Sequence, residues 1–202
     1  FSIEQYDEID SFCKEKKIDW FASSWDLISQ KEMQKFHFKN NKIASAMLTH
    51  EEFLNAVASE NIHTFISTGM STFKNIDKAV DIFKSHNCDF TLMHTVSTYP
   101  TKDFDCNIQM IQTLKEKYEC KVGYSGHEVG LLPSVIAVIN GASSIERHIT
   151  LDRSMYGSDQ AASIEIAGMK RLVRDIRSIS GILGDGKKIF SNDEKEIAKK
   201  FR

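Results

Sequence analysis

The chain has 202 residues and a formal net charge of −2, and 41% of its residues are hydrophobic. These values fit one folded domain, or most of a larger one, and exclude a disordered chain. The near-neutral charge argues against a nucleic-acid-binding protein, because no basic excess is available to neutralise phosphates. No apolar run approaches the roughly 20 residues that span a bilayer, which excludes a membrane-spanning protein.

The start of the chain and its cysteines indicate a cellular compartment. The chain begins at Phe1 without an initiator Met, a basic segment or an apolar segment, so no signal peptide is visible. We therefore expect a piece of a longer cytoplasmic protein. The cysteines are far apart and form no Cys-x-x-Cys pair, which indicates free thiols in a reducing cytoplasm: Cys13, Cys88, Cys106 and Cys120.

Short runs rich in apolar, β-branched and aromatic residues recur about every 20–30 residues, the length of one βα unit. Between them lie amphipathic stretches, in one of which Ile76, Val80 and Phe83 share a helical face. In chain order, the runs predict strands at Asp19–Trp25, Lys42–Ala46, His63–Thr68, Phe90–Val96, Lys121–Ser125 and Ser143–Ile149.

Repeated βα units predict an α/β fold with a parallel sheet, either an open doubly wound sheet or a (β/α)₈ TIM barrel. The chain has no Gly-x-Gly-x-x-Gly turn, and polar residues follow almost every predicted strand, which favours the barrel. Six strands predict an incomplete barrel whose first two strands are missing. We expect residues 1–183 to form this partial barrel and residues 184–202 to be a linker. Its two open sheet edges predict weak stability in isolation.

Two histidines follow neighbouring predicted strands. Because side chains alternate along a strand, Glu146 and His148 share a face, as do Ser125 and His127, and Arg147 points the other way. Neighbouring barrel strands then bring His127 and His148 to one rim, where two imidazoles can hold an exchangeable octahedral ion such as Mn²⁺, Mg²⁺ or Co²⁺. The alternative is two hydrogen-bonded histidines near strand ends. The mid-strand His94 is expected to be a core residue.

A lysine and several serines at the same strand ends form a candidate anion site. Lys42 opens a strand of small and apolar residues, so it must reach water, pair or bind an anion. With the strand-end hydroxyls it resembles a phosphate cradle, although ordinary capping by serine remains the alternative. One lysine leaves a doubly charged phosphate short of positive charge, so we expect a further cation from preceding strands. The serines are Ser45, Ser67, Ser97 and Ser125.

Five blocks, in this order and at these spacings, resemble the sialic acid synthase (N-acetylneuraminate synthase) family. They are Lys42–Ser45, Ser67–Met70, Tyr99–Thr101, Gly123–His127 and Glu146–His148. The resemblance implies a TIM-barrel transferase that condenses phosphoenolpyruvate with an N-acetylated amino sugar to give a nonulosonic acid and phosphate. It also implies a divalent metal, commonly Mn²⁺, and a homodimer in which an antifreeze-like domain, absent here, follows the linker.

Carried over by motif, the resemblance makes His127 and His148 the metal ligands and gives Glu146, His148 and Lys42 catalytic roles. Tyr99 and Asp159 correspond to contacts with the sugar. The expected contacts with phosphoenolpyruvate are Lys42, Ser24, Ser45, Ser67, Ser97 and Ser125.

Two other functions stay open at this stage. The chain is alternatively another metal-dependent TIM-barrel aldolase, which would not consume phosphoenolpyruvate, or a non-catalytic remnant of the synthase. Because two strands are expected to be missing, we predict that the segment alone is inactive. The amino sugar stays open between N-acetylmannosamine and the precursors of legionaminic or pseudaminic acid.

Overall fold

The computed structural model describes residues 1–202 and centres on one parallel sheet of five strands. Neighbouring strands are parallel and follow one another in the chain, so each connection is a crossover of the βα type. The strand order is β1 (Asn41–Ile43), β2 (Thr64–Ser67), β3 (Phe90–Thr95), β4 (Lys121–Gly126) and β5 (Ile145–Arg147).

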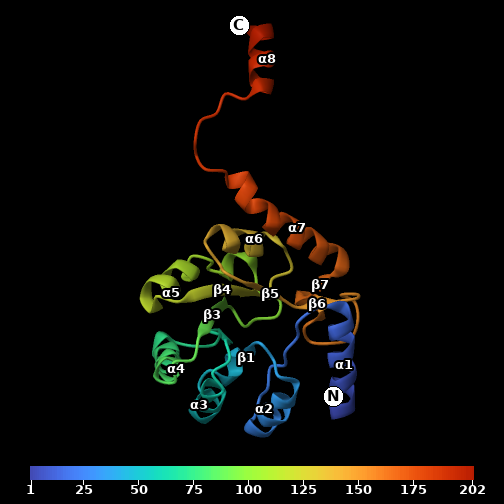
Figure 1. The fold of residues 1–202 in the computed structure, drawn as a ribbon, viewed down its shortest axis with the longest axis vertical. Helices are drawn as coiled ribbons and strands as arrows, with labels where there is room; N and C mark the ends of the chain where they lie inside the picture. Colours follow the sequence, from blue (N-terminus) through green and yellow to red (C-terminus); the bar gives the residue numbers. More distant parts are fainter.

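Helices α2 to α7 follow one another around the outside of these strands (Figure 1). Sequential parallel strands with helices on the outer side form the curled sheet of a partial barrel, and the α/β prediction is confirmed at that level. The six are α2 (Leu27–Met33), α3 (Glu51–Ser59), α4 (Phe73–Ser85), α5 (Met110–Tyr118), α6 (Leu132–Ile139) and α7 (Ile166–Leu183).

The remaining helices are shorter or lie apart from the sheet. Helix α1 (Ile3–Lys16) precedes the sheet, and α8 (Asn192–Phe201) ends the chain. Single 3₁₀ turns are η1 (Gln34–Phe36), η2 (Ser45–Met47), η3 (Asp103–Asp105) and η4 (Gln160–Ala162).

Helix α4 shows how the sequence pattern produces the packing. Thr72 and Asn75 form a reciprocal capping box that satisfies free N–H groups at the start of the helix. One turn later the apolar face begins, and Ile76, Val80 and Phe83 are buried in the core, as predicted. Each buried side chain of this size contributes about 1.5–3 kcal/mol, so this face fixes the helix against the sheet.

The predicted first strand, Asp19–Trp25, is wrong. No backbone–backbone hydrogen bond involves residues 19–25, and the segment is irregular. Its aromatic residues explain the strand-like composition in another way. Trp20 packs edge-on against Phe38 with ring centroids 4.7 Å apart, and Phe21 stacks on Phe65. Aromatic packing, and not hydrogen bonding to a neighbouring strand, holds the segment in place.

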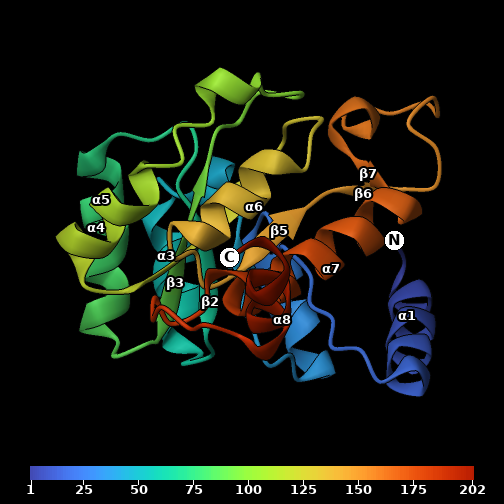
Figure 2. The ribbon, with the colours of Figure 1, turned by 90° about the horizontal axis from the view of Figure 1, so that it is seen from above.

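The other five predicted strands are confirmed in position, but the last one is broken. β5 ends at Arg147, and the chain resumes as β6 (Ile149–Thr150), which pairs with β7 (Ile164–Glu165), a strand that the sequence pattern did not predict. His148 lies at the break, and its carbonyl accepts a hydrogen bond of 2.8 Å from the Ile164 amide. Figure 2 shows this pair in orange, to one side of the main sheet and beside the start of α7.

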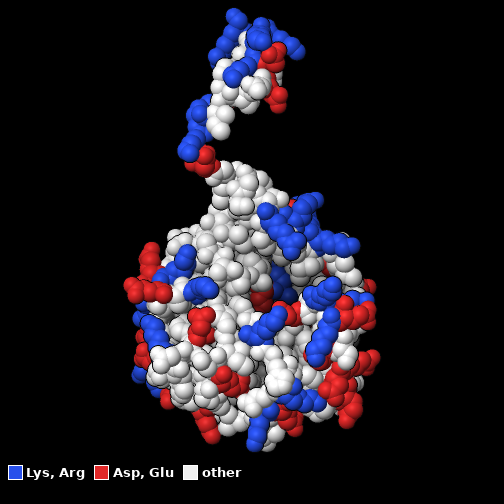
Figure 3. All heavy atoms as spheres, in the orientation of Figure 1, with Lys and Arg blue, Asp and Glu red and all other residues white.

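The segment predicted to be a linker contains one helix. α7 ends at Leu183, residues 184–191 are irregular, and α8 stands away from the sheet in Figure 1. On the face drawn in Figure 3, Lys and Arg are interspersed with Asp and Glu over the body of the molecule. None of the helices is both long and apolar enough to span a bilayer.

Candidate active site

A cavity of about 440 Å³ lies at the carboxyl ends of the strands. In an α/β barrel this is the end that carries active sites, because the loops that follow the strands converge there. Of the candidate residues predicted above, the cavity brings together all but Ser24. It is lined by Ser23, Trp25, Lys42, Ala44, Ser45, Ala46, Ser67, Met70, Ser97, Tyr99, Ser125, His127, Glu146, His148 and Asp159.

Lys42 and Glu146 form an ion pair in the floor of this cavity. The Lys42 Nζ lies 2.8 Å from Glu146 Oε2 and 2.9 Å from Oε1, and it also donates to Ser67 Oγ at 2.7 Å. Ser125 donates to Glu146 Oε1 at 2.8 Å. The Lys42 side chain is only 9% exposed, whereas 39% of the Glu146 side chain is exposed, so solvent in the cavity partly screens the attraction from the carboxylate side.

Burial and pairing act in opposite directions on this pair. Burial lowers the pKa of the Lys42 ammonium, and the charge of Glu146 opposes that shift. Burial raises the pKa of the Glu146 carboxyl, but the Lys42 charge and the hydrogen bonds from Lys42 and Ser125 outweigh it, so the pKa stays below its ordinary value. The site therefore holds an ionised carboxylate at neutral pH.

Hydroxyl groups converge beside Lys42 around Gly69, whose amide donates to Ser45 Oγ at 3.1 Å. A Cβ on Gly69 would lie 2.1 Å from Ser97 Oγ and 2.8 Å from Ser45 Oγ, so only glycine leaves room for both hydroxyls. Ser97 Oγ is buried without a hydrogen-bond partner. A buried orphan hydroxyl in the same cavity as a buried lysine is suited to an anionic oxygen.

The two candidate metal ligands meet on the other side of the cavity. The ring centroids of His127 and His148 lie 5.2 Å apart, and Tyr99 lies 4.1 Å from His127 and 5.6 Å from His148. His127 Nδ1 donates to the Val96 carbonyl at 2.8 Å, which leaves Nε2 as the unprotonated nitrogen. His148 Nδ1 lies 3.6 Å from an Asp159 carboxylate oxygen.

The donor set fits an open divalent site. Burial lowers the pKa of His127, and the nearby His148 ring lowers it further, which favours the neutral imidazole that a metal requires. A hydrogen bond from the second ring nitrogen to a backbone carbonyl is the usual orientation device for a histidine ligand. The chain contains no group of three or more His, Cys, Asp or Glu side chains arranged around one point. Two histidines would leave the remaining positions to water or substrate.

The structure separates Ser24 from the cavity. Ser24 is buried with its hydroxyl unpartnered, and its neighbour Ser23 lines the cavity together with Trp25. Because residues 19–25 do not form a strand, alternation did not predict which serine faces the cavity. His94 is a core residue, as predicted, and its Nε2 donates to the Cys106 carbonyl at 2.8 Å.

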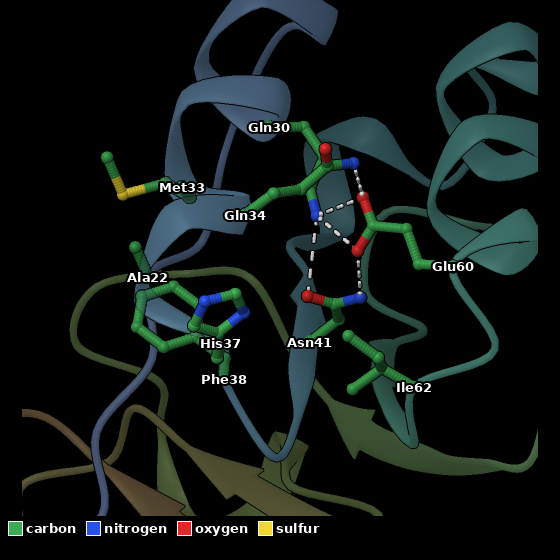
Figure 4. Close-up of a pocket in the computed structure, with 9 residues that line it drawn as sticks. All are labelled: Ala22, Gln30, Met33, Gln34, His37, Phe38, Asn41, Glu60 and Ile62. Carbon is green, nitrogen blue, oxygen red and sulfur yellow. Dashed lines mark hydrogen bonds between the residues drawn. The ribbon is translucent and has the colours of Figure 1, made fainter.

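A second cavity, of about 250 Å³, lies at the opposite, amino-terminal end of β1 and is shown in Figure 4. Its only carboxylate, Glu60, accepts hydrogen bonds from Gln30, Gln34 and Asn41 at 2.8–3.1 Å. These groups satisfy one another, and the carboxylate joins α2, β1 and α3. We interpret this cavity as a structural network between elements.

Comparison with known proteins identifies the family. The NeuB family profile matches residues 1–188. The chain is 38% identical over 178 residues to N-acetylneuraminate-9-phosphate synthase of Drosophila melanogaster, a match that covers 87% of this chain and 48% of that protein. It is 34% identical over 185 residues to N,N'-diacetyllegionaminic acid synthase of Legionella pneumophila, a match that covers 89% of this chain and 52% of that protein.

A solved structure agrees with the sequence matches. The N-acetylneuraminic acid (sialic acid) synthetase of Leptospira borgpetersenii superposes with a TM-score of 0.88 at 34% identity, covering 99% of this chain and 70% of that one. The chain spans about half the length of the two curated relatives named above. The resemblance inferred from the strand-end motifs is confirmed, and the chain belongs to the NeuB family, the family of the sialic acid synthases.

Proposed function

We propose that this chain forms the catalytic barrel of a nonulosonic acid synthase, which condenses phosphoenolpyruvate with an N-acetylated amino sugar and releases phosphate. The observation that carries this proposal is a single cavity with a buried lysine and serines on one side and paired histidines on the other. Its family membership supports the same reaction class. The free state of all four cysteines fits a cytoplasmic enzyme, and the expected homodimer belongs to this proposal.

The phosphate of phosphoenolpyruvate is assigned to the side of the cavity around Lys42. Lys42 supplies the positive charge, and Ser45, Ser67 and Ser97 supply hydroxyl donors, one of which has no other partner. Charge-assisted hydrogen bonds of this kind are worth about 1.5–3 kcal/mol each. These residues hold the phosphate in position and take no part in chemistry at phosphorus, because the bond that breaks joins carbon and oxygen.

The amino sugar is assigned to the side of the cavity around Tyr99 and the two histidines. His127 and His148 would hold the divalent ion, for which we propose Mn²⁺ ahead of Mg²⁺ or Co²⁺. Such an ion, when bound, acts as a Lewis acid toward a carbonyl oxygen. Asp159 lies beside His148, and the Tyr99 ring lies close to both imidazoles, which supports our assignment of these two side chains to contacts with the sugar.

Glu146 lies between the side of the cavity assigned to the phosphate and the side assigned to the sugar, and it carries the negative charge that the reaction needs. As carbon 3 of phosphoenolpyruvate attacks the sugar aldehyde, positive charge develops at carbon 2. The ionised Glu146, fixed by Lys42 and Ser125, stabilises that charge without having to reorient. Water then adds at carbon 2, and phosphate leaves by C–O cleavage.

The test uses the native protein that carries this chain, incubated with phosphoenolpyruvate, Mn²⁺ and a panel of sugars. The panel contains N-acetylmannosamine, its 6-phosphate, and the amino sugars that precede legionaminic and pseudaminic acid. We expect phosphate release with one of them, together with a product whose mass equals the sugar plus pyruvate. Cleavage or condensation of a sugar without consumption of phosphoenolpyruvate would indicate an aldolase, and no turnover with any sugar would indicate a non-catalytic remnant.

A further inference from the structure

Behind the active-site cavity lies a buried ion pair that the proposed chemistry does not use. Arg147 is the last residue of β5, between Glu146 and His148 in the chain, and alternation turns its side chain to the face opposite that of Glu146. There it meets Glu128, the residue that follows His127, with Arg147 Nη1 2.9 Å from Glu128 Oε1. The two side chains are 1% and 0% exposed, so both charges are removed from water.

This pair is held on all sides by further hydrogen bonds. Arg147 Nη1 also donates to the Gly130 carbonyl at 2.9 Å and to Ser134 Oγ at 3.1 Å, and Nη2 donates to the Glu128 carbonyl. Tyr124 donates to Glu128 Oε2 at 2.8 Å. The planar fork of an arginine reaches several acceptors in fixed directions, so this one side chain ties β5 to the segment after β4.

Stability alone does not account for such an arrangement. A buried ion pair costs several kcal/mol in desolvation for each ion, and apolar residues of similar volume often stabilise a protein as well or better. Arg147 Nε is also buried without a partner, which adds to the cost. What distinguishes the pair from apolar packing is that its hydrogen bonds are directional and join named atoms of the two segments.

The two segments that it joins are the ones that carry the metal-ligand candidates. Glu128 directly follows His127, and Arg147 directly precedes His148. A backbone hydrogen bond from another segment also holds each of the two histidines. The Thr101 amide donates to the His127 carbonyl at 3.1 Å, and the Ile164 amide donates to the His148 carbonyl at 2.8 Å. The β4–β5 ladder ends at the pair Gly126 and Arg147, and the Glu128–Arg147 bridge continues this connection beyond the ladder, next to the two imidazoles.

Gly126 makes room for this bridge. A Cβ at position 126 would lie 2.6 Å from Glu128 Oε2 and 2.8 Å from Oε1, and also 2.8 Å from a ring carbon of Tyr124. Any side chain at this position would push the carboxylate away from Arg147 and Tyr124. Gly126, Glu128 and Arg147 thus form one unit, and a change in one has to be matched by the others.

The geometry points to Glu128 and Arg147 as positioning residues that hold the rings of His127 and His148 at the spacing needed for one divalent cation. This inference rests on the proposed function, in which the two histidines bind the metal. It assigns the buried pair a role in metal binding that is separate from the phosphate half of the site. No hydrogen bond or ion pair joins Lys42 or Ser67, on β1 and β2, to either member of the pair.

The experiment compares metal binding, substrate binding and folding in the native protein and three variants. Arg147→Lys keeps the charge and loses the fork, Glu128→Gln keeps the shape and leaves Arg147 unpaired, and the double variant Glu128→Gln/Arg147→Met removes both charges. The measurements are Mn²⁺ affinity by the electron paramagnetic resonance signal of free Mn²⁺, KM for phosphoenolpyruvate, kcat, and the thermal melt.

We expect Mn²⁺ affinity to fall about tenfold or more in all three variants, the usual effect of losing support for a metal ligand, with the KM for phosphoenolpyruvate unchanged. The double variant should melt higher than Glu128→Gln, because no unpaired charge remains buried, and still bind Mn²⁺ weakly. That separation of stability from metal affinity is the result that a purely structural role does not produce. The matched control is Glu51→Gln/Lys78→Met, at an exposed ion pair between α3 and α4, which should behave as the wild type.

Each other outcome decides against the inference. Wild-type Mn²⁺ affinity in the folded double variant would overturn it and leave the proposed function intact. Loss of a cooperative melt in all three variants would mark the pair as purely structural. An equal fall in Mn²⁺ affinity in the Glu51→Gln/Lys78→Met control would do the same. If the wild-type protein itself binds no Mn²⁺, the metal assignment fails and the inference fails with it.

Discussion

The ammonium of Lys42 lies 2.8 Å from the carboxylate of Glu146, although 104 residues separate them in the chain. The contact joins the first strand of the sheet to the fifth, across the mouth of the partial barrel. It places a cation and an anion side by side in one small cavity, where a substrate with both a phosphate and a developing positive charge finds a partner for each.

Removal of Lys42 should weaken phosphoenolpyruvate binding. In Lys42→Met we expect the KM for phosphoenolpyruvate to rise by about 10- to 150-fold, the equivalent of one lost charge-assisted hydrogen bond network of 1.5–3 kcal/mol. Steady-state kinetics with phosphate detection measures it. Lys121→Met, an exposed lysine at the opposite end of the sheet, is the control. An unchanged KM would show that the phosphate binds elsewhere.

Gly69→Ala should damage the same half of the site for a steric reason. The new methyl group would overlap Ser97 Oγ and crowd Ser45 Oγ, so both hydroxyls must move. We expect at least a tenfold higher KM for phosphoenolpyruvate. Gly181→Ala is the matched control, because nothing lies within 4 Å of that Cβ and an alanine in α7 should raise the stability of the helix by up to about 1 kcal/mol. Equal KM values for phosphoenolpyruvate in the two variants would contradict the assignment of the phosphate to the serines around Gly69.

Removal of the metal tests the histidine side of the cavity separately from the side that is assigned to phosphoenolpyruvate. Dialysis against a chelator should abolish phosphate release, and added Mn²⁺ should restore it. His148→Asn should lower Mn²⁺ affinity by tenfold or more while phosphoenolpyruvate still binds, which calorimetry detects directly. His37→Asn serves as control, because His37 lies at the opposite end of β1 with a left-handed backbone that Asn tolerates. Full turnover in the presence of chelator would refute the metal assignment.

The buried His94 should make stability depend on pH. Burial lowers the pKa of His94 in the folded state, so below about pH 6.5 the unfolded chain binds a proton that the folded chain does not. The free energy of unfolding therefore falls as the pH drops below 6.5, and His94 contributes nothing to this dependence above that range.

His94→Gln keeps a donor for the Cys106 carbonyl and cannot titrate. Between pH 7.5 and 5.5, the variant should lose less stability than the wild type, by at most about 1.4 kcal/mol per pH unit for one proton. Urea unfolding at several pH values measures both slopes, and the remaining titrating groups cancel in the difference. Parallel slopes in the two proteins would rule out a contribution from His94.

Strand β5 illustrates how much of the site was predictable. Alternation along one strand placed Glu146 and His148 on one face and Arg147 on the other, and the structure has that arrangement. The same local reasoning predicted the buried face of α4 and the core position of His94. The pattern did not predict the partner of Arg147 on the face opposite the cavity, which the structure shows to be Glu128.

Other parts of the site depended on features that periodicity does not contain. Residues 19–25 have a strand-like composition but pack through aromatic rings, so Ser23 instead of Ser24 lines the cavity. β7 has only two residues, too few for any pattern to appear. The space above Gly69 and Gly126 is likewise set by side chains from distant segments.

The sequence by itself determined the order of the five strands of the main sheet and which reactive side chains stand at their ends, because both follow from local periodicity and propensity. Only the tertiary structure decided which of these side chains meet. Lys42 reaches Glu146, and Glu128 reaches Arg147, because the sheet curls and the side chains around them pack in one way. Contacts of this kind join segments that are distant in the chain, and no short stretch of sequence specifies them.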